Sequence, residues 1–278
     1  MLGTAFPAAR LLLVEQPLPW GAEGLRTSSF PREVALALEA RGRAAGVRVQ
    51  AFRRPGGRRG TSARRWAFVD TGNASPGLCS GTFTDPAELL EHPLDGSVGV
   101  PQDAPLYLVC AHGKHDPCCA QRGRPVITAL EALRPGRVWQ ASHLGGCRFA
   151  PTLLALPLGL MYGRVHASAV EQLVAATEKG EVDERWLRGR IGIPPAAQVA
   201  VAFAQNQLGH PRSRDISLAS TTRVDAATVE VALDTPQGRA TVLVRRERVD
   251  AVGLTCAAPG PSWFLAHRAL SIRLADST

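Results

Sequence analysis

The apolar positions in the first third of the chain change from strand-like to helical spacing and back. An unbroken apolar run at residues 11–14 predicts a strand over residues 11–15. Alanine, leucine and valine then recur at helical spacing over residues 33–45, and residues 47–52 and 66–70 have strand-like patterns. A strand–helix–strand order of this kind predicts an α/β segment with a partly parallel sheet, which we place at residues 1–104.

A new unit begins in the middle of the chain, after a linker rich in proline, glycine, aspartate and serine at residues 91–104. We expect, in order, a strand, a helix with Pro125 in its first turn, a second strand, a β-hairpin and an amphipathic helix, at residues 106–110, 126–133, 138–141, 153–165 and 167–178. Strand, helix, strand, hairpin and helix is the order of a thioredoxin-like domain, here expected at residues 105–185. A thioredoxin-like origin is also one interpretation of the first segment.

The last part of the chain, residues 186–278, has a helical pattern at 196–208 and then a period of two. Strands are expected at residues 228–233, 240–246 and 249–256, as a small antiparallel meander in an α+β region. We expect Cys256 to lie in this sheet as a buried thiol. Cys79, in a Gly/Ser/Thr-rich loop with no second ligand nearby, is expected to be a plain thiol as well.

Composition predicts an ordinary soluble protein. The chain has 278 residues, 45% of them hydrophobic, which is enough for a substantial core. No apolar run approaches the ~20 residues of a membrane span, and the N-terminal residues do not form a targeting signal. Six cysteines without a secretory signal favour a reducing compartment, so we expect a cytoplasmic protein with no membrane partner.

The basic charge does not by itself indicate a nucleic-acid partner. The formal net charge is +8, but the arginines are spread along the whole chain. The only dense basic run consists of Arg53, Arg54, Arg58, Arg59, Arg64 and Arg65. It lacks the interleaved aromatic residues that stack on bases. We interpret this run as a solvated loop or as a docking patch for an acidic partner protein, and expect no nucleic-acid binding.

Two short stretches, residues 110–119 and 142–147, place metal-seeking side chains after apolar runs. Cys110 and Cys119 are separated by eight residues, and His143 and Cys147 by three. Iron–sulfur clusters need four soft or borderline donors, and imidazole is the usual substitute for a thiolate. Because both pairs are expected at the same edge of the sheet, we predict that they jointly hold one iron–sulfur cluster.

Two glycines between the ligands of the second pair support this hypothesis. Gly145 and Gly146 have no side chains, so the backbone can pass close to a cofactor and direct its N–H groups at bridging sulfides. Arg148 is either a fold-stabilising ion-pair residue or a cation near the negative charge of the cluster. His112 and His115 are expected to be polar loop residues or outer donors rather than ligands.

Other uses of the same side chains stay open at this point. Three cysteines and a histidine are a good zinc set, although structural zinc prefers shorter spacing than C-x₈-C, so a zinc-stabilised interaction module is one alternative. A thiol oxidoreductase using Cys118 or Cys119 is another, although the vicinal pair is not a C-x-x-C motif. A Rieske-type site is not expected, because its second motif, C-x-x-H, is incomplete. Ala150 stands where the histidine of that motif would be needed.

Residues 106–165 also carry a family resemblance. They contain C-x-H-G before the second cysteine, then G-R-P, V-W-x-x-S-H-L-G-G-x-R-F-A and L-P-x-G-L-x-Y-G-R-V. With these motifs the chain resembles the sucrase/ferredoxin-like family, with a weaker match in its N-terminal part. The name suggests a glycosidase, but that chemistry needs two suitably placed carboxylates, and Asp116 and Glu131 are the only acidic residues of the region.

The resemblance implies a thioredoxin-like ferredoxin domain with a [2Fe-2S] cluster, held by a C-x₈-C pair and an H-x-G-G-H pair. Carried over to this chain, these are Cys110 with Cys119 and His143 with Cys147, where a cysteine replaces the expected histidine. The implied function is single-electron transfer or redox sensing with an unidentified redox partner protein, rather than stand-alone catalysis.

The ligand charge predicts the redox behaviour of such a site. Three thiolates and one imidazole carry less negative charge than four thiolates, so we expect a midpoint potential between the roughly −400 mV of plant-type ferredoxins and the upper Rieske range. The free nitrogen of His143 could couple a proton to the electron.

Overall fold

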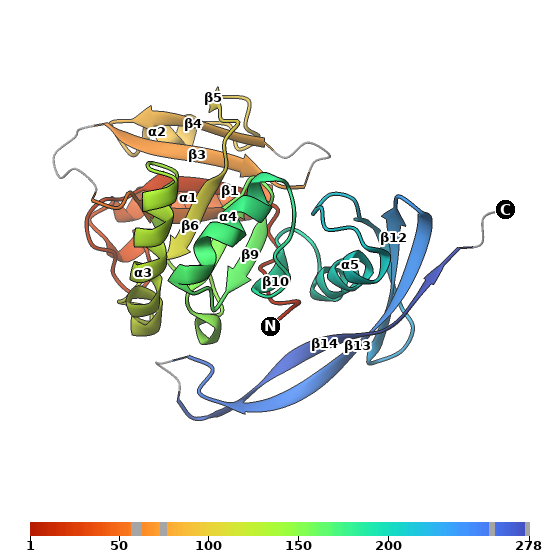
Figure 1. Cartoon of the computed structure of the whole chain (residues 1–278). Helices are drawn as coiled ribbons and strands as arrows, with labels where there is room; N and C mark the ends of the chain where they lie inside the picture. The colour runs from red at the N-terminus through yellow and green to blue at the C-terminus, as the bar shows by residue number, and fades with distance from the viewer. Residues whose placement is uncertain (57–62, 73–76, 256–258, 276–278) are drawn as a thin grey trace.

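The computed structural model describes residues 1–56, 63–72, 77–255 and 259–275. Its strands form two sheets (Figure 1). The larger sheet has ten strands in the order β10-β9-β8-β6-β7-β2-β1-β3-β4-β5, and the smaller has four in the order β11-β12-β13-β14.

The first half of the larger sheet comes from the N-terminal segment. Its elements are β1 (Arg10–Glu15), the 3-10 turn η1 (Leu25–Thr27), α1 (Arg32–Ala45), β2 (Val47–Arg53), β3 (Arg64–Asp70), β4 (Gly77–Phe83), the one-turn α2 (Glu88–Glu91) and β5 (Val100–Pro101). The second half comprises β6 (Leu106–Cys110), α3 (Pro117–Leu133), β7 (Val138–Ala141), η2 (Cys147–Phe149), β8 (Thr152–Leu156), β9 (Leu160–Gly163), η3 (Ala167–Ala169), α4 (Val170–Glu178) and β10 (Leu187–Arg190).

The two halves share one topology. In the second half, β6 runs parallel to β7 and antiparallel to β8, which is antiparallel to β9. In the first half, β1 has the same relations to β2 and β3, and β3 is antiparallel to β4. The halves join where β2 pairs antiparallel with β7, at Phe52 opposite Ala141. The expected α/β class and thioredoxin-like strand order are thus confirmed.

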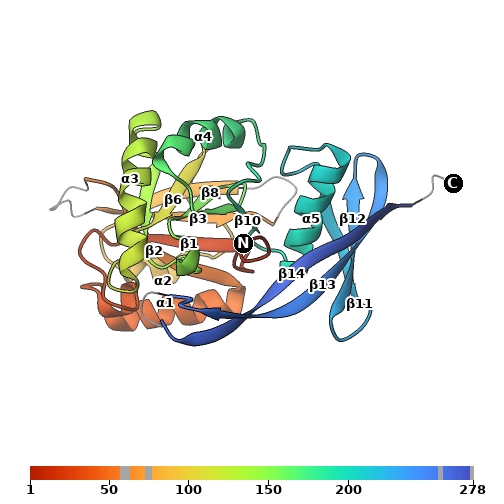
Figure 2. The same ribbon diagram turned by 60° about the horizontal axis from the view of Figure 1, so that its bottom comes forward.

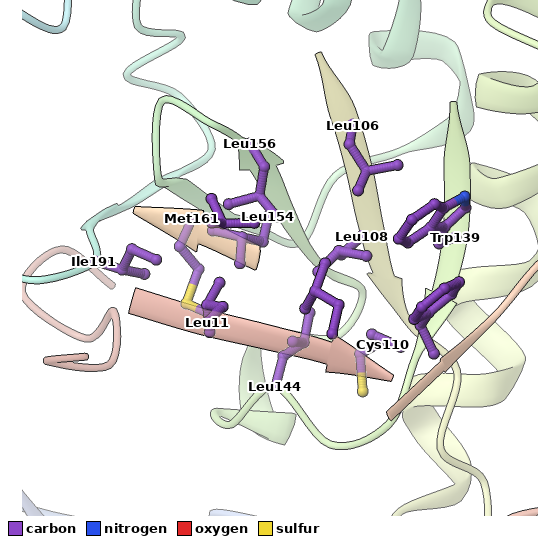
Figure 3. Close-up of a cluster of buried hydrophobic side chains, with 14 of the residues drawn as sticks. Leu11, Leu106, Leu108, Cys110, Trp139, Leu144, Leu154, Leu156, Met161 and Ile191 are labelled. Carbon is purple, nitrogen blue, oxygen red and sulfur yellow. The ribbon is translucent and has the colours of Figure 1, made fainter. Parts of the chain in front are cut away.

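The larger sheet is curled, and both of its faces are buried. The four helices lie on the outer face of the curl, with α3 and α4 packed on the second half of the sheet and α1 and α2 on the first half (Figure 2). Leu12 and Val14 of β1 face the side of α1, whereas Leu11 and Leu13 point into a core shared with the second half. Figure 3 shows Leu11 of this shared core beside Met161 of β9. Burial on both faces is the reason that the strands appear as continuous apolar runs in the sequence.

The structure corrects the expected start of the central helix. The sequence pattern favoured residues 126–133 with Pro125 in the first turn, but α3 begins at Pro117. The Asp116 side chain accepts the N–H of Cys118 at 3.1 Å and caps the helix, so Asp-Pro is the start signal. Pro125 lies inside the helix. Cys119 is therefore in the first turn of a helix rather than in a loop.

Two further expectations were wrong. Cys79 lies in strand β4 rather than in a loop, and its thiol contacts the carbonyl oxygen of Val98 at 3.2 Å. In the tail, the strand expected at residues 249–256 is the continuation of β13, which runs without a break to Val252. Cys256 lies outside the described residues.

The C-terminal region packs α5 (Pro195–Leu208) on the smaller sheet. The strands of this sheet are β11 (Ser217–Arg223), β12 (Thr228–Thr235), β13 (Gly238–Val252) and β14 (Pro261–Leu274), and they form the expected antiparallel meander. The hairpin of β13 and β14 extends beyond β12 along the larger domain (Figures 1 and 2). No helix in the described part of the chain is both long and apolar enough to cross a membrane.

Candidate metal centre

The four predicted ligands come together at one end of the shared core. Cys110 is the last residue of β6, Cys119 is in the first turn of α3, and His143 and Cys147 belong to the loop between β7 and β8. All three cysteines are free thiols and buried. Parallel strands β6 and β7 end at the same sheet edge, which brings the two sequence stretches together.

The three sulfurs form a hydrogen-bonded set. Cys119 interacts as a thiol with the sulfurs of Cys110 and Cys147, which raises the pKa of Cys119. The hydrogen bond from Cys119 outweighs burial and, with the N–H groups of His112 and Leu144, lowers the pKa of Cys110 to about 7. The lowered pKa favours the thiolate form of Cys110, which is the form that binds metals.

His143 is held as a neutral imidazole beside Cys147. Its Nδ1 lies 3.5 Å from the Cys147 sulfur. Burial, followed by the positive neighbours His115 and Arg48, lowers the pKa of His143 to about 4. The ring therefore has a free lone pair at neutral pH, as a metal ligand requires.

His112 orients the second ligand pair. Its Nε2 donates to the carbonyl oxygen of Gly21 at 2.6 Å, and its Nδ1 accepts the backbone N–H of His143 at 3.1 Å. These two bonds define one tautomer and fix the start of the ligand loop. His115 is exposed, and its ring contacts the His143 ring at a tilt of 37°, with centroids 3.8 Å apart.

A different grouping of three residues could hold a single ion. One ligand atom each from His115, His143 and Cys147 lie within 4.8 Å of one another. This set shares two residues with the predicted one and adds an exposed histidine. It therefore keeps zinc as an alternative for the same location.

The sequence left open which of the vicinal cysteines could be a ligand. The sulfur of Cys118 takes part in a disulfide. Cys119 is the free thiol and is the one that contacts Cys110 and Cys147.

The glycine pair has a role that the sequence did not reveal. Gly145 and Gly146 both have positive φ, at 88° and 73°, a conformation that favours glycine. A Cβ atom on Gly146 would lie 2.4 Å from Nη2 of Arg188. Gly146 thus makes room for an arginine, whereas a Cβ on Gly145 would meet no atom within 4 Å.

Arg148 does not occupy the position of the cation near the sulfurs. Its guanidinium lies over the rings of Phe149 and Phe264, at 4.4 Å and 4.8 Å. Burial and then Arg164 lower its pKa, and the cysteines do not act on it. The arginine that interacts with the sulfurs is Arg188 of β10, which sequence analysis missed because nothing in its pattern marks an inward-pointing charge.

The donor set fits an iron–sulfur cluster. Cys110 contacts Cys119, His143 contacts Cys147, and Cys119 bridges the two pairs. Two close pairs are the arrangement needed when each of two irons takes two protein ligands, and the buried sulfurs have mainly one another as partners. A cavity of about 380 Å³, lined by His112, His115 and His143 among others, lies beside the second pair.

Comparison with solved structures finds distant similarity to thioredoxin-like [2Fe-2S] ferredoxins. One is the ferredoxin from Aquifex aeolicus, which is 22% identical, with a TM-score of 0.29, over 34% of this chain and 97% of that chain. A cysteine-to-serine variant of the ferredoxin from the same organism is 21% identical, with a TM-score of 0.27, over 30% and 97%. No curated protein matches the chain significantly.

The comparison with family models gives a broader match. The model of the sucrase/ferredoxin-like family matches residues 1–189, which include both halves of the larger sheet and all four candidate ligands. A match over more than half of the chain shows its membership. This chain belongs to the sucrase/ferredoxin-like family.

Proposed function

We propose that the chain transfers single electrons, or senses redox state, through a [2Fe-2S] cluster held by Cys110, Cys119, His143 and Cys147. The observation that carries the proposal is the convergence of three buried thiols and a neutral imidazole as two contacting pairs. When bound, the cluster would supply a one-electron redox couple.

The residues around the site support this use. The N–H groups of His112 and Leu144 point at the Cys110 sulfur and stabilise negative charge there. His112 holds the backbone of His143, and the shared core excludes water from the cysteines. Such a rigid, dry first layer keeps the geometry of the ligands unchanged between two oxidation states.

We propose that a redox partner protein docks at the edge formed by His115 and His143. His115 is exposed and its ring contacts that of the proposed ligand His143, so this edge is a short route from the site to the surface. An acidic partner would suit the basic chain, but Arg53 and Arg54 already contact Gln140 and Glu15. Arg58 and Arg59 lie outside the described residues. The expected cytoplasmic location stays a prediction.

The test is anaerobic purification followed by metal analysis and visible spectroscopy. The proposal predicts a reddish-brown protein with equimolar iron and acid-labile sulfide. A colourless protein with one stoichiometric zinc would contradict it and support the zinc-stabilised module that the His115, His143 and Cys147 grouping favours.

Thiol oxidoreductase activity is a weaker alternative for the same residues. The lowered pKa of Cys110, about 7, would suit a nucleophilic thiolate. However, Cys110 and Cys119 are only 1% and 2% exposed, so a disulfide substrate could not reach them. Metal-free protein that reduces disulfides would support this alternative.

A further inference from the structure

Arg188 is a buried cation that has no acidic hydrogen-bond partner among the described residues. It is 2% exposed and is the largest of the fully buried side chains. Its guanidinium donates to the carbonyl oxygens of Gly145 and Thr4, at 2.9 Å and 2.6 Å, and to the hydroxyls of Thr152 and Thr4, at 3.2 Å and 3.1 Å. All of these acceptors are neutral.

A buried charge with only neutral partners is costly. Removing an ion from water costs several kcal/mol even after the protein relaxes, and hydrogen bonds to neutral groups offset only part of this cost. Burial, followed by repulsion from Arg148, lowers the pKa of Arg188 to about 10, so the side chain is still charged at neutral pH. A negative group nearby would offset the rest of this cost.

Among the described residues, the groups that act on Arg188 in this sense are the sulfurs of the metal centre. Cys147, Cys110 and Cys119 each favour its charged form, in that order. The local backbone is also shaped around this arginine. Besides the Gly146 contact, a Cβ on Gly163 of β9 would lie 2.9 Å from the Cδ atom of Arg188. Arg188 therefore lines the site, and its guanidinium is hydrogen-bonded to the ligand loop at the carbonyl oxygen of Gly145.

We propose that Arg188 is the counter-charge of the metal centre, a positioning residue that favours the reduced state by compensating its added negative charge. The proposal rests on the [2Fe-2S] function proposed above. A cluster with three thiolates is anionic, and reduction adds one negative charge. A fixed cation in a low-dielectric wall stabilises the reduced state more than the oxidised state, which raises the midpoint potential.

The test is a redox titration of purified holoprotein followed by visible absorption and EPR. Arg188→Gln removes the charge but retains hydrogen-bonding ability. We expect the ratio of reduced to oxidised protein at a fixed applied potential to fall roughly tenfold, which for one electron is a shift of about −59 mV. Arg188→Lys keeps the charge and should keep a midpoint close to that of the wild type.

Arg190 supplies a matched control on the same strand. It is also largely buried with a pKa lowered to about 10, it donates to the Ser213 carbonyl oxygen at 3.0 Å, and the cysteines do not act on it. Arg190→Gln should leave the midpoint unchanged. An equal shift in Arg188→Gln and Arg190→Gln, or no shift in Arg188→Gln, would overturn the proposal.

If Arg188→Gln cannot be titrated because it has lost its cluster, the iron content of Arg188→Gln and Arg188→Lys is compared instead. Loss of the cluster in Arg188→Gln but not in Arg188→Lys would show that the charge is needed and supports the proposal. Loss in both variants would show that the hydrogen-bond geometry matters instead, and overturns it. Wild-type protein without iron would refute the proposed function itself, a result distinct from an unshifted potential in iron-loaded protein.

Discussion

Cys147 is the residue at which this chain departs from the pattern that its family resemblance implies. A cysteine stands where a histidine is expected, and it lies 3.5 Å from the imidazole of His143. The side chain is buried and its sulfur accepts a hydrogen bond from Cys119. Cys147 therefore links the two ligand pairs, and as a cluster ligand it would add one thiolate charge that a histidine would not.

Replacing Cys147 tests its assignment as a ligand. Cys147→Ser exchanges a soft donor for a hard one, so we expect the iron content of purified protein to fall at least about tenfold. The matched control is Cys79→Ser, which removes another buried free thiol, one that contacts backbone carbonyl oxygens of Gly96 and Val98. Iron and sulfide assays should separate the two variants, and equal losses would refute the assignment.

His143 also affects the net charge of the proposed site, because it is a neutral donor where a cysteine would be a thiolate. His143→Cys replaces a neutral donor with a thiolate and adds one negative charge, so the midpoint potential should fall towards the roughly −400 mV of all-cysteine plant-type ferredoxins. Voltammetry of the iron-loaded variant measures the shift. An unchanged potential would mean that His143 is not a ligand.

At the scale of elements, the sequence predicted the positions of the strands more accurately than the side chains that line the site. Strand-like patterns placed β1, β2, β6 and β7 almost to the residue; those of β1 and β6 are apolar runs, because these strands are buried on both faces. The start of α3 was missed because Pro125 is a start signal in most contexts, whereas here Asp116 and Pro117 begin the helix. The inward direction of Arg188 depends on a partner in another element, and no local pattern encodes it.

The contact of α3 with β6 gives a prediction at this scale. A Cβ on Gly123 would lie 2.7 Å from the carbonyl oxygen of Cys110, so Gly123→Ala must push the helix away from the strand that carries the first ligand. We expect a loss of about 1–3 kcal/mol in unfolding free energy, despite the better helix propensity of alanine. Urea denaturation measures it.

Gln121→Ala is the control for this substitution, because Gln121 is exposed on the same helix. It should change the unfolding free energy by less than about 0.5 kcal/mol. If Gly123→Ala is as stable as Gln121→Ala, the close packing of α3 on β6 is not present in solution.

At the scale of the whole molecule, two halves of like topology share one core. The junction is the β2–β7 pair, where the rings of Phe52 and Trp139 stack with centroids 3.8 Å apart. Sequence analysis expected a thioredoxin-like domain beside a related α/β segment. It did not predict their continuous sheet, because pairing between Phe52 and Ala141 joins residues far apart in the chain and leaves no local pattern.

The junction predicts an unequal effect of two tryptophan substitutions. Trp139→Ala removes one half of the buried stack and should lower the unfolding free energy by about 3–5 kcal/mol. Trp263 of β14 is 51% exposed, and its replacement by alanine should cost less than about 1 kcal/mol. Equal stabilities of the two variants in denaturant titrations would contradict the shared core.

The central claim is that three thiolates and the imidazole of His143 hold one [2Fe-2S] cluster. Pulsed EPR on the dithionite-reduced protein, labelled with ¹⁵N-histidine, tests the metal and the unusual ligand together. The account predicts an S = 1/2 signal with hyperfine coupling to a single histidine nitrogen, and loss of that coupling in His143→Cys. A reduced sample without this signal, or a signal with no histidine coupling, would contradict it.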